Sequence, residues 1–147
     1  MIITPPDFNI AIYTIKALKK IVCNKNVTVK IFCNGLNAKH ERKISVLIKS
    51  WSNVIMATNR KTIHDNIEKI KTQIGGNYID DRGRTEIREG LWEPCGTVWE
   101  RELLSFDTEL VGLIDADFEI LQPEYIFIML KELENDKSIG FYSTDYS

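Results

Sequence analysis

Hydrophobic residues recur along this chain at two spacings, one typical of helices and one typical of strands, with turn signals between them. Residues 27–33 combine β-branched and aromatic side chains, which predicts a strand, and Asn34-Gly35 follows as a turn signal. Residues 38–51 place apolar side chains at the i, i+3, i+4, i+7 spacing of a helix. A second short strand is predicted over 53–57, before Thr58-Asn59. The first part of the chain therefore has strand–helix–strand order.

Further elements continue this alternation. A first helix is predicted where Ala11, Ile15, Leu18 and Val22 form one stripe, and a later one where Ile63, Ile67, Ile70 and Ile74 do so before Gly75-Gly76. The polar stretch 77–94 has no clear period and predicts a long loop. The remaining predictions are a helix over 96–106, a strand over 110–114, a helix opened by Pro123 with Ile126, Met129, Leu130 and Leu133 inward, and a strand over 139–142.

Repeated strand–helix units predict an α/β fold with a mainly parallel sheet flanked by helices. At 147 residues, the chain (1–147) is expected to form a single domain with its own core. The strand order does not follow from the sequence.

Composition and charge narrow the classes of protein. A net charge of −2, without a stripe of Lys and Arg among aromatics, predicts no basic field and argues against nucleic acid as a partner. No apolar run approaches the roughly 20 residues of a membrane span, and the N-terminus lacks a signal-peptide pattern. Cys23, Cys33 and Cys95 are widely spaced, which predicts reduced thiols in a cytoplasmic protein.

The clearest chemical signal is a pair of acids, Asp115 and Asp117, directly after the apolar run 111–114. Open α/β sheets bind ligands outside the carboxyl ends of their strands, where this pair is predicted to lie. Two neighbouring carboxylates repel unless a cation or a shared proton relieves them. Mg²⁺ or Mn²⁺ bridging to a diphosphate provides that relief, and the small Ala116 leaves room for a ligand. The simpler alternative is a solvated turn, since Asp favours turns.

Two other acidic motifs fit less well. A calcium hand that began at Asp115 would need glycine and glutamate where the chain has Ile120 and Ile126. A phosphohydrolase of the haloacid-dehalogenase type carries Thr or Val two residues after its Asp-x-Asp, where this chain has Glu119. A metal-dependent phosphohydrolase with Asp115 as nucleophile stays open as an alternative.

The stretch Leu-Ile-Asp-Ala-Asp-Phe-Glu-Ile-Leu-Gln-Pro-Glu-Tyr-Ile resembles the Asp-x-Asp region of nucleotide-sugar glycosyltransferases of the GT-A fold, family 2 type. The resemblance implies a Rossmann-like nucleotide-binding half and a nucleotide-diphospho-sugar donor. Asp117 would ligate Mn²⁺ or Mg²⁺, and Asp115 would lie near the ribose, the diphosphate or the metal. The donor-binding residues that the resemblance implies are Thr4, Asn34, Gly35, Thr58, Asp115 and Ala116.

The chain also departs from this family. Many members carry an acid where Asn34-Gly35 stands. Only thirty residues follow Asp117, whereas the acceptor-binding half and the catalytic base of inverting members lie after the motif. The catalytic base and the glycan, lipid or protein acceptor are therefore not identified. The sequence fits a chain truncated after its donor-binding half, or a non-catalytic nucleotide-binding remnant or interaction module.

Overall fold

The structure is a computed structural model that describes residues 1–22, 25–65, 78–79, 85–86, 92–93, 95–117 and 124–139. The strands are β1 (Ile2–Ile3), β2 (Val29–Cys33), β3 (Val54–Thr58), β4 (Tyr78–Ile79) and β5 (Thr85–Glu86). The helices are α1 (Phe8–Val22), α2 (Ala38–Ile48), α3 (Arg60–Asp65), α5 (Cys95–Leu103) and α6 (Glu124–Asn135).

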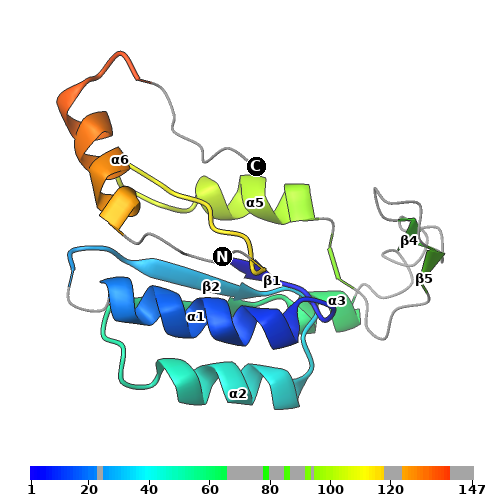
Figure 1. The fold of residues 1–147 in the computed structure, drawn as a ribbon. Coiled ribbons are helices and arrows are strands. Elements are labelled where there is room, and N and C mark those ends of the chain that lie inside the picture. The colour runs from blue at the N-terminus through cyan, green and yellow to red at the C-terminus, as the bar shows by residue number, and fades with distance from the viewer. Residues whose placement is uncertain are drawn as a thin grey trace.

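Strands β1, β2 and β3 form one parallel sheet in the order β1-β2-β3 (Figure 1). Ile3 pairs with Cys33, and Cys33 pairs with Thr58, so the three strands end at the same edge. Strands β4 and β5 form a separate antiparallel pair within the polar stretch that was predicted to be a loop.

Helices cover both faces of the parallel sheet, because successive side chains of a strand point to opposite faces. Ile3 and Ile31 belong to the cluster under α1 and α2, whereas Ile2 and Phe32 pack with Val98 of α5. Figure 1 shows α1 and α2 on one side of the sheet and α5 on the other. The predicted α/β architecture, a parallel sheet flanked by helices, is therefore confirmed.

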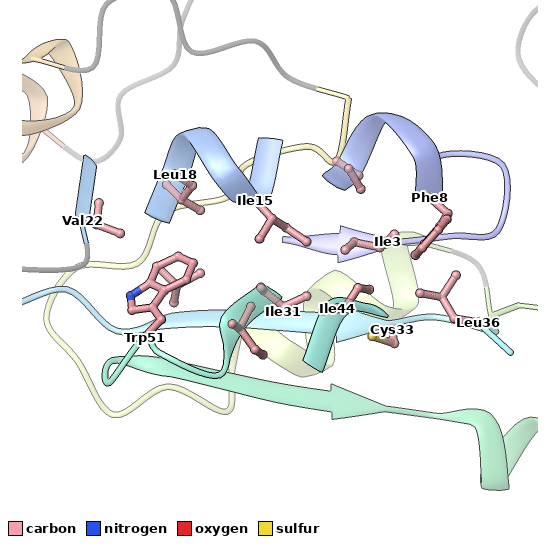
Figure 2. Close-up of a cluster of buried hydrophobic side chains, with 14 residues drawn as sticks. Ile3, Phe8, Ile15, Leu18, Val22, Ile31, Cys33, Leu36, Ile44 and Trp51 are labelled. Carbon is pink, nitrogen blue, oxygen red and sulfur yellow. The ribbon is translucent and has the colours of Figure 1, made fainter. Parts of the chain in front are cut away.

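The main core lies between α1, α2 and the sheet. Figure 2 shows its side chains pointing inward from both helices and from β1 and β2. The stripe predicted for the first helix is buried in full, as are Ile44, Ile48 and Trp51. Lys19 joins the two helices at the surface, since its Nζ donates to the Leu47 carbonyl at 3.0 Å and to Ser50 Oγ at 2.7 Å.

The strand predicted over 110–114 is wrong, because this segment has no regular secondary structure. Val111 and Leu113 are 42% and 48% exposed, while Ile114 is half-buried and packs against the main core. Two physical causes contribute. Gly112 supplies no side chain and weakens a strand interior. The neighbouring strand β1 has only two residues, so it offers little backbone for a further ladder.

Two other predictions hold in part. The helix opened near Pro123 forms as α6, but its four predicted inward residues are half-buried and none is fully buried. The helix that carries Ile63 is described as far as Asp65. The later apolar residues of that helix and Gly75-Gly76 lie outside the described residues. So do Cys23 and residues 140–142 of the last predicted strand.

Among the described residues, no helix is long and apolar enough to cross a membrane.

Candidate functional site

The parallel sheet gathers four of the predicted donor-binding residues at one edge. Thr4 follows β1, Asn34 and Gly35 follow β2, and Thr58 ends β3. Backbone hydrogen bonds continue across this edge beyond the strands. The Asn34 amide donates to the Ile3 carbonyl at 2.9 Å, and the Asn59 amide donates to the Cys33 carbonyl at 3.4 Å. These four residues therefore lie at the carboxyl ends of neighbouring strands.

Asn34 is fully buried there, and its side chain makes three hydrogen bonds to two neighbouring residues. Its Nδ2 donates to the Glu93 carbonyl at 2.8 Å, and its Oδ1 accepts from the Glu93 amide at 3.0 Å. The same Oδ1 accepts from Asn59 Nδ2 at 2.8 Å. The side-chain amide of Asn34 thus bonds both the N–H and the C=O of Glu93, as the backbone of a neighbouring strand would. Asn34 thereby fixes residue 93, just ahead of α5, to the end of β2.

Gly35 extends this network. Its amide donates to Asn59 Oδ1 at 2.9 Å, so both ends of the Asn59 amide are used within the protein. Gly35 has a φ of 73°, a conformation that glycine adopts without steric cost. The turn after β2 is therefore built by Asn34, Gly35 and Asn59 together.

Thr4 and Thr58 are also engaged by neighbouring side chains. Thr4 Oγ1 donates to Asp7 Oδ2, which closes the turn between β1 and α1. Thr58 Oγ1 donates to Glu41 Oε1 at 2.5 Å, and the other Glu41 oxygen pairs with Arg60 at 3.2 Å.

The acidic turn Asp115-Ala116-Asp117 lies against α1. Thr14 Oγ1 donates to the Ala116 carbonyl at 2.7 Å in a buried hydrogen bond, and the Ala116 side chain is buried in the main core. Asp115 is half-buried and Asp117 is exposed. The buried alanine fixes the turn, while the second carboxylate faces solvent.

The acidic turn lies near the start of the chain (Figure 1). Figure 1 shows the segment before it (yellow) running between α5 and the sheet and ending near the N-terminus. The Met1 amino group is close enough to Asp115 for that carboxylate to oppose the effect of burial, which lowers the pKa of the amino group. Asp115 thus lies near the Met1 amino group.

Two acids, Asp7 and Asp115, affect the pKa of Cys95, which lies at the start of α5. Burial raises the pKa of its thiol, and the carboxylates of Asp7 and Asp115 raise it further. Burial also raises the pKa of Cys33 to about 12, with a smaller contribution from Glu41. Because the thiolate is the nucleophilic form, neither cysteine is suited to nucleophilic catalysis at neutral pH.

The acidic turn supplies two hard oxygen donors, which is the chemistry that Mg²⁺ and Mn²⁺ prefer. Among the described residues, no group of three or more His, Cys, Asp or Glu side chains is placed to hold a metal ion. Mg²⁺ commonly keeps several waters and binds through one or two carboxylates together with substrate phosphates. Asp115 and Asp117 fit that kind of site, in which a diphosphate completes the coordination.

Comparisons of the chain with protein-family models, with curated proteins and with solved structures found no match.

Sequence reasoning missed three residues that shape these sites: Thr14, Asn59 and Glu93. Asn59 carried a usable signal, because it follows β3 as Asn34 follows β2, and two amides at adjacent strand ends are placed to pair. Thr14 and Glu93 act through contacts over 102 and 59 residues of sequence separation. No local pattern predicts such contacts.

We expect His40, in the first turn of α2, to make the fold less stable at acidic pH. Its ring stacks on Phe8 with centroids 3.8 Å apart, and its buried Nδ1 has no hydrogen-bond partner among the described residues. Burial, Lys43 and Lys39 lower the pKa of His40 from its ordinary value of 6.5. The unfolded chain therefore binds this proton more readily than the folded chain, so stability falls as the pH drops below about 6.5.

We expect this loss to be smaller in His40→Phe, which keeps an aromatic ring on Phe8 but cannot be protonated. Urea unfolding at several pH values between about 7 and 5 measures the difference. Equal pH slopes in the two proteins would contradict the assignment to His40.

Proposed function

We propose that this chain binds the donor of a metal-dependent nucleotide-sugar glycosyltransferase. The observation that carries the proposal is the placement of the acidic turn: a buried hydrogen bond from Thr14 holds Ala116, and Asp117 is exposed beside it. The parallel sheet with helices on both faces supports it, because such sheets bind ligands outside the carboxyl ends of their strands. Fold alone does not establish function, so the acidic turn is the part to test.

In this proposal Asp117 ligates Mg²⁺ or Mn²⁺, and Asp115 supports the ribose or the metal shell. The ion, when bound, supplies charge neutralisation for the departing nucleoside diphosphate. Thr14 acts as a positioning residue, because its hydrogen bond to Ala116 fixes the spacing of the turn from α1. Gly35, with its positive φ, allows a close approach of the backbone to the ligand at the sheet edge.

One observation favours a second candidate, a non-catalytic nucleotide-binding remnant or interaction module. The polar side chains of Asn34, Asn59 and Thr58 are already bonded within the protein. Slow hydrolysis of a nucleotide-sugar donor distinguishes the two candidates. A transferase without its acceptor releases sugar to water, whereas a pure binder leaves the donor intact.

The direct test measures the thermal stability of the wild-type chain and of Asp117→Ala with UDP or GDP, with and without Mn²⁺. A ligand that binds only the folded state adds RT ln(1 + [L]/Kd) to the free energy of unfolding, about 2.7 kcal/mol at a hundredfold excess over Kd. The unfolding midpoint rises accordingly. We expect metal-dependent stabilisation of the wild type by one nucleotide and its loss in Asp117→Ala.

Asp107→Ala is the matched control, since Asp107 is an exposed aspartate ahead of the acidic turn. It should keep the stabilisation. Undiminished binding by Asp117→Ala would overturn the role of Asp117, and no shift with either nucleotide would return the acidic pair to an ordinary turn.

A further inference from the structure

Helices α1 and α2 lie side by side on one face of the sheet (Figure 1). Side chains of both helices line a groove of about 680 Å³. Its walls are apolar, with Ile12 and Tyr13 on one side and Val46 and Leu47 on the other. Four cations border it: Lys16, Lys39, Arg42 and Lys43. Within the part of the chain that the structure describes, no acidic residue lines it.

The charge of this face differs from that of the rest of the chain. Helices α1 and α2 carry six basic residues and one acidic residue. The remainder of the chain holds thirteen of the nineteen Lys and Arg and twenty of the twenty-one Asp and Glu. The single acid of the two helices, Glu41, is buried and bonded to Thr58 and Arg60. The net charge of −2 therefore conceals a positive face, and the expectation of no basic field does not hold here.

Large apolar side chains project from the same face. Tyr13 is 73% exposed and Val46 is 69% exposed. Lys16 Nζ lies 5.7 Å from the centre of the Tyr13 ring, so a cation and an aromatic ring are presented together. Tyrosine prefers positions where one end is apolar and the other is wet, as at the boundary between lipid and water.

We propose that the α1–α2 face docks on a membrane surface that contains anionic phospholipids. Cations near such a surface are attracted to its negative potential, and exposed aromatic and aliphatic side chains enter the headgroup region. Charge complementarity favours an anionic surface. The exposed aliphatic Val46 and the apolar groove favour lipid over nucleic acid, which offers phosphates but no acyl chains.

This inference does not depend on the proposed donor site. The two are connected in space, because α1 and α2 begin directly after β1 and β2. Phe8 and Lys39, at the starts of the helices, line the end of the groove nearest the carboxyl edge of the sheet. Docking by this face brings that edge close to the lipid surface.

Flotation with vesicles of phosphatidylcholine, with or without phosphatidylserine, tests the proposal. We expect the chain to float only with phosphatidylserine vesicles and to be released by salt. The pair Arg42→Gln and Lys43→Gln should lower the partition coefficient by about tenfold or more, since each basic residue near such a surface contributes on the order of 1 kcal/mol. Tyr13→Ser should weaken binding further without changing the charge.

The matched control replaces two exposed lysines elsewhere, Lys61→Gln and Lys131→Gln, which changes the net charge equally. This variant should bind as the wild type does, and Asp117→Ala should also bind, which separates this result from that of the donor site. Circular dichroism checks that each variant is folded. Absence of vesicle binding, equal losses in the test and control pairs, or binding of single-stranded RNA in place of vesicles would each overturn the proposal.

Discussion

Replacing Asn34 by alanine is expected to destabilise the fold by about 2–4 kcal/mol, because it removes three hydrogen bonds from a fully buried position. The Glu93 amide and carbonyl and the Asn59 Nδ2 would lose their partner at this site. A buried polar group without a partner costs about 1–3 kcal/mol, and partial relaxation keeps the total below the simple sum. Urea unfolding followed by circular dichroism measures the change.

Asn9→Ala provides the control, since Asn9 is an exposed asparagine on α1 and the chemical change is identical. It should alter stability by no more than about 0.5 kcal/mol. The double variant Asn34→Ala and Asn59→Ala should cost less than the sum of the single variants, because either change alone breaks the bond between the two amides. Additive effects would show that the two side chains do not act together.

The role of Asn34 also shows how far sequence reasoning reaches at the sheet edge. Strand spacing and the turn signal place Asn34-Gly35 correctly after β2, because these features depend on neighbouring residues. The partners of Asn34 lie 25 and 59 residues away, and no local pattern encodes them. An amide predicted to contact a nucleotide is thus engaged in holding the edge together.

The acidic turn illustrates a different limit. The apolar run 111–114 has the composition of a buried strand, but a strand forms only where a neighbour offers backbone groups for pairing. Strand β1 has only two residues, and Gly112 interrupts the run of side chains. The segment forms no strand; Ile114 packs against the main core and Ala116 is buried in it, while Val111 and Leu113 are exposed. The apolar composition of the run therefore predicted neither its pairing nor the exposure of these two side chains.

The positive face shows a third limit, which concerns total charge. A sequence total adds charges that the fold separates, so −2 says little about any one surface. The basic residues of α1 and α2 are distributed among apolar residues along the sequence, and only the packing of the two helices brings them together around one groove.

Ile15→Ala is expected to cost about 2–5 kcal/mol, the range for removing a large buried aliphatic side chain. Ile15 has no exposed surface, and Figure 2 shows it pointing from α1 toward Ile3 and Ile31 of the sheet. With a domain of this size, the midpoint of thermal unfolding should fall by roughly 6–15 °C.

Ile10→Ala makes the same change on the same helix at a side chain that is 52% exposed, and it should shift the midpoint by about 2 °C or less. Because α1 also carries Thr14 and one wall of the groove, Ile15 holds in place the element on which both proposals depend. Equal shifts in the two variants would mean that α1 is not packed on the sheet as described, and that both the acidic turn and the positive face need a different support.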